Sequence, residues 1–523
     1  MNSHEKNLCN LIKANVKLIQ IVSYETLRFQ GMLIHVSEEL ERDLYTWDRV
    51  DGIKKWNGSR FEVYNKDDED EEYRHADAAI DFYKKKDNII LLLEDFYPDF
   101  TENNPKMLRT LRNIAAQDSE NKTLIFSQPF LQLPKELEKD VHILDLPYPK
   151  FEDQKQIYNR VCGRYGIQPG EPDAKLIEAA LGLTIMEAEK AFSLAYIENQ
   201  QLTRVEIPLV IREKENVIKK SGYLEYYDPK ETMNEVGGLE NLKDWLKKRG
   251  RGFDKHAKDY GLTYPKGILL LGIPGTGKSL TAKAVGNLWH FPLLRLDMGK
   301  IFGGIVGESE KNIREALKIA EAISPSILWV DEIEKGMSGI SSSGSTDGGT
   351  TARVLGTFLT WMQEKTSPVF VVATANDISQ LPPELLRKGR VDEIFFVDLP
   401  TQKEREQIIK IHLQKKHRNP NDFDVATLAK EAKGFSGAEL EEAVKEALFQ
   451  AYDEEKEICD SHILKAIAKT YPLSRTMAET IDKMRKWAKS RAVAASTEEA
   501  ETLEKKDGDT PKLKQETYNN PFV

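Results

Sequence analysis

The chain has 523 residues, of which 40% are hydrophobic and 31% charged, and its formal net charge at pH 7 is −10. This length exceeds one ordinary core, so we expect two or three domains, and the acidic balance makes nucleic acid an unlikely partner. No apolar run approaches the ~18 residues that span a bilayer, and the opening MNSHEKN lacks the pattern of a secretory signal. We therefore expect a cytoplasmic protein whose three cysteines are reduced.

The first half of the chain carries little recognisable chemistry. NIILLLEDF, residues 88–96, predicts a buried strand that ends in two acids, Glu94 and Asp95. The acidic run KDDEDEE at 66–72 is interpreted as a solvated insertion.

A strand, a glycine-rich loop and a helix follow one another in KGILLLGIPGTGKSLTAKAVG. The apolar run at 268–271 predicts a buried strand, and residues 272–279 match G-x-x-x-x-G-K-[ST], whose backbone N–H groups surround phosphates at a helix N-terminus. Lys278 is expected to contact the β and γ phosphates of ATP, and the Ser279 hydroxyl to bind Mg²⁺. The predicted nucleotide-binding residues of this segment are Gly272, Pro274, Gly275, Thr276, Gly277, Lys278, Ser279 and Leu280.

A second buried strand is predicted in SILWVDEIE, residues 326–334, and it is followed by carboxylates. Asp331 would hold magnesium through water, while Glu332 would orient and deprotonate an attacking water. Glu334 is interpreted as a surface or helix-start residue, because it lies a turn beyond the other two. The first two acids predict hydrolysis of a nucleoside triphosphate.

Two polar segments follow a third apolar strand at 369–373. Asn376 lies just after this strand, and ligands of parallel sheets meet the C-terminal ends of strands, so Asn376 is expected beside the same phosphates. Taken alone, it would be better interpreted as an ordinary turn asparagine. LLRKGRVDE, residues 385–393, then places Arg387 and Arg390 one helical turn apart. Without further context, these arginines would be two solvated surface charges.

The order of these motifs resembles the AAA ATPases that have a second region of homology. The similarity runs from EVGGLENLK at 235, through GIPGTGKS, GESEKNIREAL, ILWVDEIE, ATAN and LLRKGRVDE, to GFSGAELEEAV at 434. It implies a P-loop AAA module, in which a parallel α/β sheet with flanking helices carries a helical lid. It also implies that Asn376 senses the γ phosphate. By the same resemblance, the residues against the adenine and at the start of the lid helix are Val236, Gly237, Gly238, Gly437 and Ala438.

For the two arginines, the resemblance implies a role outside their own subunit. In this family, Arg387 and Arg390 would point into the nucleotide site of the next subunit and neutralise charge on the γ phosphate. Because such heterologous contacts close into rings, we expect a homo-oligomer, with a hexamer as the family's usual ring. Motions of the ring would remodel a protein partner whose identity the sequence does not give.

In many relatives, a loop with an aromatic residue before G-E-S-E lines the pore of the ring. Here KIFGGIVGESE places Ile305 at the aromatic position, Gly304 where a lysine is common, and Phe302 three residues away, where we interpret it as a core residue. Since isoleucine has no ring face, threading of a polypeptide is less strongly indicated than ATP hydrolysis. The glycine- and serine-rich segment at 338–351 predicts a mobile loop, either at the pore or as a simple linker.

The run YPLSRTMAETIDKMRKWAKSRAVAAS, residues 471–496, resembles the end of the AAA proteins known as the hypothetical chloroplast reading frame family. That family is shared by plastids and cyanobacteria and linked to photosynthetic regulation, so the plastid stroma is the alternative compartment. Residues from 497 contain few large apolar side chains and predict a disordered tail.

Fragments of the second half recur in the first half in the same order. LQLPKEL at 131 matches SQLPPEL at 379, HILDLP at 142 matches IFFVDLP at 394 with Asp145 opposite Asp398, and LGLTIMEAE at 181 matches KGFSGAELE at 433. Glu94 and Asp95 stand where the acids of the second copy stand, but no G-K-[ST] loop precedes them. We therefore predict a degenerate AAA-like α/β domain that is catalytically silent, with an unrelated α/β adaptor as the alternative.

The predicted domains are a degenerate AAA-like domain at 1–222, a linker at 223–235, a nucleotide-binding α/β domain at 236–398, a helical lid with a C-terminal helix at 399–496, and a disordered tail at 497–523. The expected activity is Mg²⁺-dependent ATP hydrolysis by an oligomer that remodels or regulates a protein. An ATP-gated scaffold with slow turnover is the alternative, and a nucleic-acid loader is less favoured.

Overall fold

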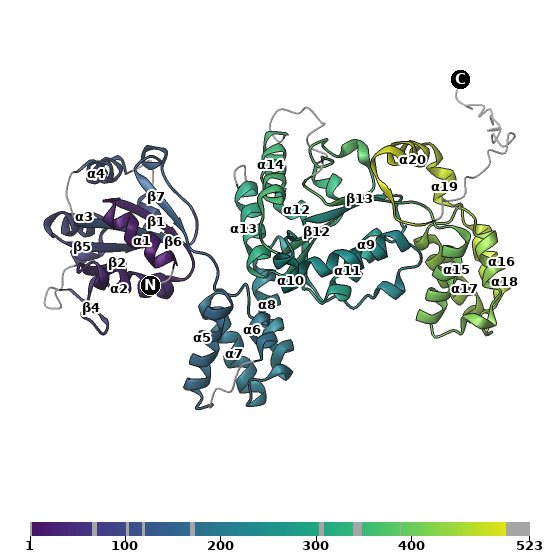
Figure 1. Cartoon of the computed structure of the whole chain (residues 1–523), viewed down its shortest axis with the longest axis horizontal. Helices are drawn as coiled ribbons and strands as arrows, with labels where there is room; N and C mark the ends of the chain where they lie inside the picture. The colour runs from purple at the N-terminus through teal and green to yellow at the C-terminus, as the bar shows by residue number, and fades with distance from the viewer. Residues whose placement is uncertain are drawn as a thin grey trace, which may run out of the picture. The chain divides into compact units, whose positions relative to one another are not determined.

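The computed structural model describes residues 3–64, 71–100, 104–117, 121–167, 173–302, 308–337, 348–387 and 389–497. The chain divides into two units, Met1–Val217 and Ile218–Val523. Each unit contains a seven-stranded sheet and a bundle of helices (Figure 1). Among the described helices, none has the length and apolar character needed to cross a bilayer.

The sheet of the first unit has the strand order β4-β3-β2-β5-β6-β1-β7. The five strands from β2 to β7 are parallel, and the hairpin strands β3 and β4 are antiparallel. Helices α1 and α2 cover one face, and α3 and α4 cover the other, because apolar residues alternate along most strands and feed two separate cores. The bounds are β1 (Leu18–Val22), β2 (Asp43–Asp48), β3 (Gly52–Trp56), β4 (Phe61–Val63), β5 (Ile89–Glu94), β6 (Lys122–Gln128), β7 (Val141–Asp145), α1 (Ser3–Lys13), α2 (Thr26–Glu39), α3 (Ala76–Lys85) and α4 (Pro105–Ala116).

Four helices with a core of their own complete the first unit. Thr184 caps the third of these helices, and its hydroxyl and the Glu187 carboxylate form a capping box. The boundary between the units falls within the last helix, after Val217. The bounds are α5 (Phe151–Arg164), α6 (Ala174–Ala179), α7 (Ile185–Asn199) and α8 (Ile207–Ser221).

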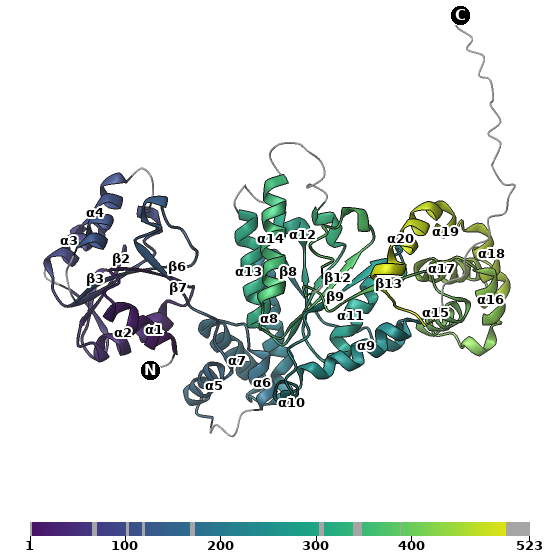
Figure 2. The ribbon, with the colours of Figure 1, turned by 45° about the horizontal axis from the view of Figure 1, so that its top comes forward.

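The sheet of the second unit has the order β14-β13-β9-β12-β11-β10-β8, and β8 is its one antiparallel strand among the described residues. Helices α13 and α14 lie on one side and α9 and α11 on the other (Figure 2). The bounds are β8 (Leu224–Tyr227), β9 (Gly267–Gly272), β10 (Leu293–Leu296), β11 (Ser326–Val330), β12 (Val369–Ala375), β13 (Glu393–Val397), β14 (Val493–Ala494), α9 (Glu240–Gly250), α10 (Lys255–Asp259), α11 (Lys278–Trp289), α12 (Met298–Phe302), α13 (Glu308–Ala322) and α14 (Gly348–Glu364).

The lid is a bundle of four helices with a separate core. Helix α20 does not share that core, although the sequence placed it with the lid. Ile481, Met484 and Ala488 pack into the core of the α/β sheet. The Arg485 guanidinium donates hydrogen bonds of 2.8, 2.9 and 3.1 Å to the carboxylate of Asp398, just after β13. The bounds are α15 (Gln402–Lys415), α16 (Val425–Glu431), α17 (Gly437–Asp453), α18 (Asp460–Lys469), α19 (Leu473–Thr476) and α20 (Ala478–Arg491).

Other segments also differ from the sequence expectations or lie beyond the described residues. The region predicted as a linker, 223–235, contains β8 and a 3₁₀ helix, because the apolar side chain of Leu224 is buried where β8 pairs with β10. Residues 348–351 of the predicted loop form the start of α14. Phe302 packs against the main core, as predicted. Gly304, Ile305, residues 338–347, the acidic residues 66–70 and the tail from 498 lie outside the described residues.

The two sheets repeat one topology. The order β7-β1-β6-β5-β2 in the first unit corresponds to β13-β9-β12-β11-β10 in the second. The acids that follow β5 and β11 also agree, since Asp95 and Glu332 have positive φ angles of 49° and 47°. The pairing of the strands corrects one predicted match. Ile21 of β1 and Leu270 of β9 are equivalent, since they pair with Ser127 and Thr374 at the same place in the two sheets. On their other side, Ile21 pairs with Leu144 and Leu270 pairs with Phe395. Asp145, the next residue, therefore corresponds to Phe396 rather than to Asp398. The shared strand order confirms that the first unit has an AAA-like fold.

Candidate functional site: a triphosphate cavity under the lid

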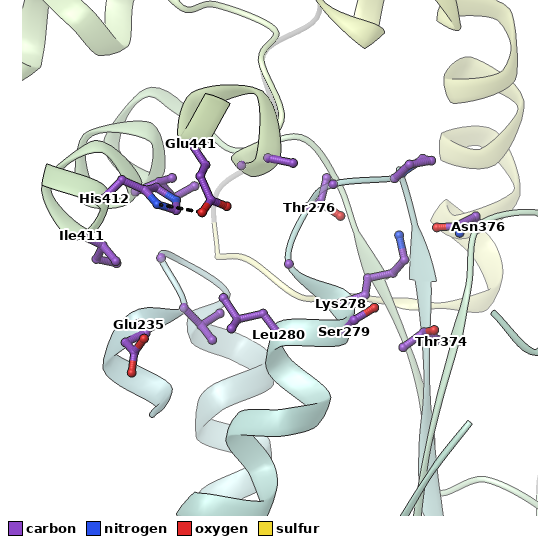
Figure 3. Close-up of a pocket in the computed structure, with 18 of the residues that line it drawn as sticks. Glu235, Thr276, Lys278, Ser279, Leu280, Thr374, Asn376, Ile411, His412 and Glu441 are labelled. Carbon is purple, nitrogen blue, oxygen red and sulfur yellow. Dashed lines mark ion pairs between the residues drawn. The ribbon is translucent and has the colours of Figure 1, made fainter. Parts of the chain in front are cut away.

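A cavity of about 330 Å³ lies at the C-terminal ends of β9 and β12, between the α/β sheet and the lid. Figure 3 shows Lys278, Ser279, Thr374 and Asn376 on one side of it, and Ile411, His412 and Glu441 from the lid on the other. The described lining residues are Glu235, Val236, Gly237, Pro274, Gly275, Thr276, Gly277, Lys278, Ser279, Leu280, Glu332, Thr374, Asn376, Ile408, Ile411, His412, Gly437, Ala438 and Glu441. The loop, the acids and the lid that the sequence predicted are thus brought together.

Two glycines of the loop after β9 have different tasks. Gly277 has a φ of 91°, and a Cβ added there would meet nothing within 4 Å, so the space beside it is open to a ligand. Gly275 has a φ of 76°, and its Cβ would lie 3.0 Å from the Ala438 side chain. Its carbonyl oxygen accepts a hydrogen bond of 2.9 Å from the Ala438 N–H. The loop is therefore shaped both to leave room for phosphates and to contact the first turn of lid helix α17.

Lys278 is buried at the start of α11. Its ammonium donates hydrogen bonds to the carbonyl oxygens of Gly272, at 2.9 Å, and Ile273, at 2.7 Å. Burial lowers the pKa of Lys278 to about 8, although the carboxylates of the site oppose this shift. An ammonium has three N–H donors, so one of them is left for an incoming phosphate.

Asp331 lies at the centre of a hydrogen-bond network. Its Oδ1 accepts from the Ser279 hydroxyl at 2.9 Å and from the Thr374 hydroxyl at 2.7 Å. The Thr374 hydroxyl in turn accepts from the backbone N–H of Glu332, at 2.9 Å, where the chain turns through the positive φ. Hydroxyl and carboxylate oxygens beside a phosphate loop are the donors that Mg²⁺ prefers, so these side chains fit the predicted metal.

Asn376 bridges two acids. Its side-chain Nδ2 donates to Glu332 Oε1 at 3.0 Å, and its backbone N–H donates to Glu334 Oε1 at 2.8 Å. Glu332 also forms an ion pair with Lys335. Glu334 is 4% exposed and burial raises its pKa, so it is not a surface residue, but it does lie in the first turn of a 3₁₀ helix, Ile333–Met337, as the alternative of a helix-start residue predicted. It holds the backbone of Asn376, a role that its sequence position did not reveal.

Replacing Glu334 separates this positioning role from a charge effect. In Glu334→Ala, the half-buried Asn376 N–H loses its acceptor, and we expect the free energy of unfolding to fall by about 1–3 kcal/mol. Glu334→Gln keeps an acceptor of the same size and should remain within about 1 kcal/mol of the wild type. Denaturant unfolding of both variants measures the difference, and equal losses would show that the hydrogen bond to Asn376 is not what matters.

The far end of the cavity is apolar and comes largely from helix α15. Ile408, Ile411 and His412 are spaced to share one face of this helix, and a Cβ on Gly237 would lie 2.5 Å from Ile408 Cγ1. His412 Nδ1 lies 3.9 Å from Glu441 Oε1, and burial lowers the pKa of His412. Sequence reasoning missed these lid residues, although the helical spacing in IIKIHL offered a signal.

Glu441 is expected to tune nucleotide affinity through His412. Glu441→Ala should raise the KM for ATP roughly two- to fivefold with little change in kcat, because it removes one partly exposed ion pair at the base end. Glu442→Ala is the matched control, since Glu442 is also exposed on α17 and pairs with Lys445 instead. Equal KM values for the two variants would contradict the assignment.

Several predicted site residues lie outside the lining. Gly238 donates its N–H to Gln407 Oε1, and its Cβ would lie 2.1 Å from Glu404 Oε1, so it permits a close backbone contact with α15. Gly272 likewise packs against the backbone of Val397. Asp331 does not line the cavity itself, but it accepts hydrogen bonds from Ser279 and Thr374, which do.

Arg387 and Arg390 also lie outside the cavity of their own chain. Arg387 is exposed and Arg390 is half-buried. Nη1 of Arg390 is buried and has no hydrogen-bond partner in the described part of the chain. Among the described lining residues, Lys278 is the one lysine and there is no arginine.

Family comparisons identify the same parts of the chain. Residues 268–399 match the ATPase family associated with various cellular activities (AAA), and residues 422–465 match the AAA+ lid domain. Residues 4–146 match the N-terminal domain of SpoVK-like AAA ATPases, and residues 154–221 match their second domain.

Individual relatives extend the similarity over nearly the whole chain. The AAA domain-containing protein ycf46 of Guillardia theta is 39% identical over 493 residues, which are 93% of this chain and 95% of the relative. The protein of the same name from Pyropia yezoensis is 40% identical over 485 residues, 91% and 96% of the two chains. The cell division cycle protein 48 homolog of Archaeoglobus fulgidus is 32% identical over 256 residues, 48% of this chain and 34% of that one. The chain therefore belongs to the AAA ATPase family, and it carries SpoVK-like domains before a single AAA module.

Proposed function

We propose that this protein hydrolyses ATP with Mg²⁺ and uses the energy, as an oligomeric ring, to remodel or regulate a protein partner. The observation that carries the proposal is the continuous network of Ser279, Asp331, Thr374, Glu332 and Asn376 along one side of a cavity that also contains Lys278. A site for binding alone would need the loop and the lysine but not a carboxylate base held beside them.

The residues divide the chemistry among themselves. The loop N–H groups and the Lys278 ammonium bind the phosphates, and Glu332 orients a water and takes its proton. Asn376 holds Glu332 Oε1 at 3.0 Å and so fixes the carboxylate. Mg²⁺ would be held by the Ser279 hydroxyl and, through water, by Asp331, and it supplies positive charge to the phosphates. Val236, Gly237, Ile408 and His412 line the other end of the cavity, where the base would lie.

Phosphate release by the purified full chain tests the proposal. With MgATP we expect steady turnover, which EDTA reduces to background and added Mg²⁺ restores, because the oxygen ligands at Ser279 and Asp331 act through the metal. Lys278→Ala should weaken ATP binding by at least about tenfold, because a charge-assisted contact to phosphate is lost. Background rates for the wild type in the presence of MgATP, under every protein concentration tried, would contradict the proposal.

A ring and a plastid setting are further parts of the proposal. The ring rests on the absence of an arginine among the described lining residues and on the position of Arg387 and Arg390 away from their own cavity. The hexamer is the usual ring of the resembling family. The resemblance to the hypothetical chloroplast reading frame family supports a role in photosynthetic regulation, in the plastid stroma or in cyanobacterial cytoplasm. Capture with a slow-hydrolysing variant would identify the partner.

A scaffold that binds ATP and turns over slowly is the second candidate. It is favoured by the state of Glu332, whose two carboxylate oxygens are engaged by Asn376 and Lys335. In this second candidate, the ion pair with Lys335 keeps Glu332 from activating water. Lys335→Ala distinguishes the two candidates, since faster turnover in that variant would mean that the ion pair restrains the wild type.

A further inference from the structure

The connection between β1 and α2 stands where the phosphate loop stands in the second unit. Ser23, Tyr24 and Glu25 join β1 to α2, whereas residues 273–277 join β9 to α11. The strands correspond in register, since Ile21 pairs with Ser127 as Leu270 pairs with Thr374. The first connection is therefore shorter and contains no glycine.

Glu25 takes the position of Gly277, because each is the residue immediately before the helix that follows the strand. Beside Gly277 there is open space, as described above, and this is where the phosphates of a nucleotide are expected. Glu25 has a side chain there, and that side chain is 6% exposed. The corresponding volume in the first unit is therefore occupied by the protein itself.

The partners of Glu25 are those that a phosphate would seek. Its Oε1 accepts a hydrogen bond of 2.7 Å from the backbone N–H of Ile185, the first residue of helix α7. Its Oε2 accepts one of 2.7 Å from the Arg28 guanidinium. A helix N-terminus and an arginine are the groups that bind phosphates in proteins.

Helix α7 corresponds to lid helix α17. Thr184 and Glu187 form the capping box of α7, as Ser436 and Glu439 form that of α17. In the second unit the phosphate loop touches α17 through the bond between Gly275 and Ala438, and in the first unit Glu25 touches α7 at Ile185. Arg28 also donates to the carbonyl oxygen of Pro147, in the connection that leads from β7 into α5.

Glu94, at the end of β5, also has a hydrogen-bond partner within the first unit. Glu94 corresponds to Asp331, because Glu94 pairs with Ser127 and Asp331 contacts Thr374. Gln30 of α2 donates to Glu94 Oε1 at 2.5 Å. In the second unit, Asp331 accepts instead from the hydroxyl of Ser279, which lies three residues nearer the start of its helix than Gln30 does. The acid of the first unit thus has a neutral amide as its partner, and the acid of the second unit has a hydroxyl that is predicted to bind the metal.

We propose that the Glu25 carboxylate replaces the nucleotide phosphate in the first unit and ties its four-helix bundle to its sheet permanently. The first unit is then a closed AAA fold that needs no nucleotide, and the ATP cycle acts on the second unit alone. A buried carboxylate shared by Ile185 and Arg28 resists removal, because loss of one partner leaves the other group desolvated. This inference goes beyond the proposed ATPase activity and does not depend on it.

Hydrogen–deuterium exchange of the full chain, read by mass spectrometry, tests the proposal. In the wild type without nucleotide, the peptide containing Ile185 should exchange slowly, and saturating MgAMP-PNP should leave it unchanged while it protects the peptide containing Ala438. In Glu25→Ala, exchange at the start of α7 should be at least about tenfold faster, because the acceptor for the Ile185 N–H is gone. Nucleotide binding should saturate at one per chain and should be at least about tenfold weaker in Lys278→Ala.

Two further variants make the result specific. Glu39→Ala removes an exposed acid from the other end of α2 and should leave exchange at Ile185 unchanged. Glu25→Gln keeps an acceptor but not the charge, so its exchange should fall between those of the wild type and Glu25→Ala. The comparison of these variants needs no nucleotide. Its result therefore tests the role of Glu25 even if the second unit has no ATPase activity. Protection of the Ile185 peptide by nucleotide in the wild type, a second nucleotide per chain, or equal exchange in Glu25→Ala and Glu39→Ala would each overturn the proposal.

Discussion

Replacing Glu332 by glutamine is expected to lower the rate of phosphate release by about 10²–10⁴-fold while ATP affinity changes by less than about threefold. The glutamine oxygen can still accept from Asn376 Nδ2, which lies 3.0 Å from Glu332 Oε1 in the wild type. It cannot take a proton from water. The proposed phosphate contacts are those of Lys278 and the loop, which the substitution does not change, so binding and hydrolysis should separate.

Steady-state phosphate release and titration with a fluorescent ATP analogue measure the two quantities on the same preparation. Glu364→Gln is the matched control, because Glu364 is an exposed acid at the end of α14 in the same unit. The variant should also retain a partner that the wild type releases, since it holds ATP without turning it over. If Glu332→Gln hydrolysed ATP at the wild-type rate, the base would lie elsewhere, and slow turnover in both proteins would favour the scaffold.

Local patterns in the sequence were sufficient to predict the strands that lead to Lys278 and Asp331. The strands before Lys278 and Asp331 are short apolar runs followed by glycine or acid residues, and all lie where they were predicted. The reason is that a parallel sheet brings the ends of its strands to one edge, so position along each strand fixes position in space. Thr374 directly follows the strand predicted at 369–373. Its hydrogen bonds to Asp331 and to the Glu332 backbone depend on the register between two strands, which the sequence does not show.

Contacts between distant segments could not be predicted. His412 and Glu441 meet because two lid helices pack together, and neither residue belongs to a motif of the α/β sheet. Helix α20 was assigned to the lid from its place in the chain, whereas its apolar face fits the core of the sheet and Arg485 pairs with Asp398. In the first unit, the repeat was visible in the sequence, but Glu25 and Ile185 are 160 residues apart and no short pattern links them.

Replacing Arg387 or Arg390 by alanine is expected to reduce turnover by about 10³–10⁵-fold, with ATP binding nearly unchanged. The phosphate end of the cavity has Lys278 as the one lysine among its described lining residues, and charge that develops on the γ phosphate needs a further cation. Arg387 is exposed, so it is available to a neighbouring protomer. The buried Nη1 of Arg390, which has no hydrogen-bond partner in the described part of the chain, would gain from an anionic group nearby.

Mixing two inactive variants shows whether the arginines act on a neighbour. Lys278→Ala has an impaired pocket and intact arginines, and Arg387→Ala has the reverse. If the guanidinium acts in trans, an equal mixture should recover about a quarter of the wild-type rate, because both the pocket and its neighbour must be of the right kind at each heterologous interface. Arg475→Ala, an exposed arginine of the same unit, should be fully active alone. A mixture that stays inactive although the subunits exchange would mean that each arginine acts on its own chain, and the ring would then have no part in the chemistry.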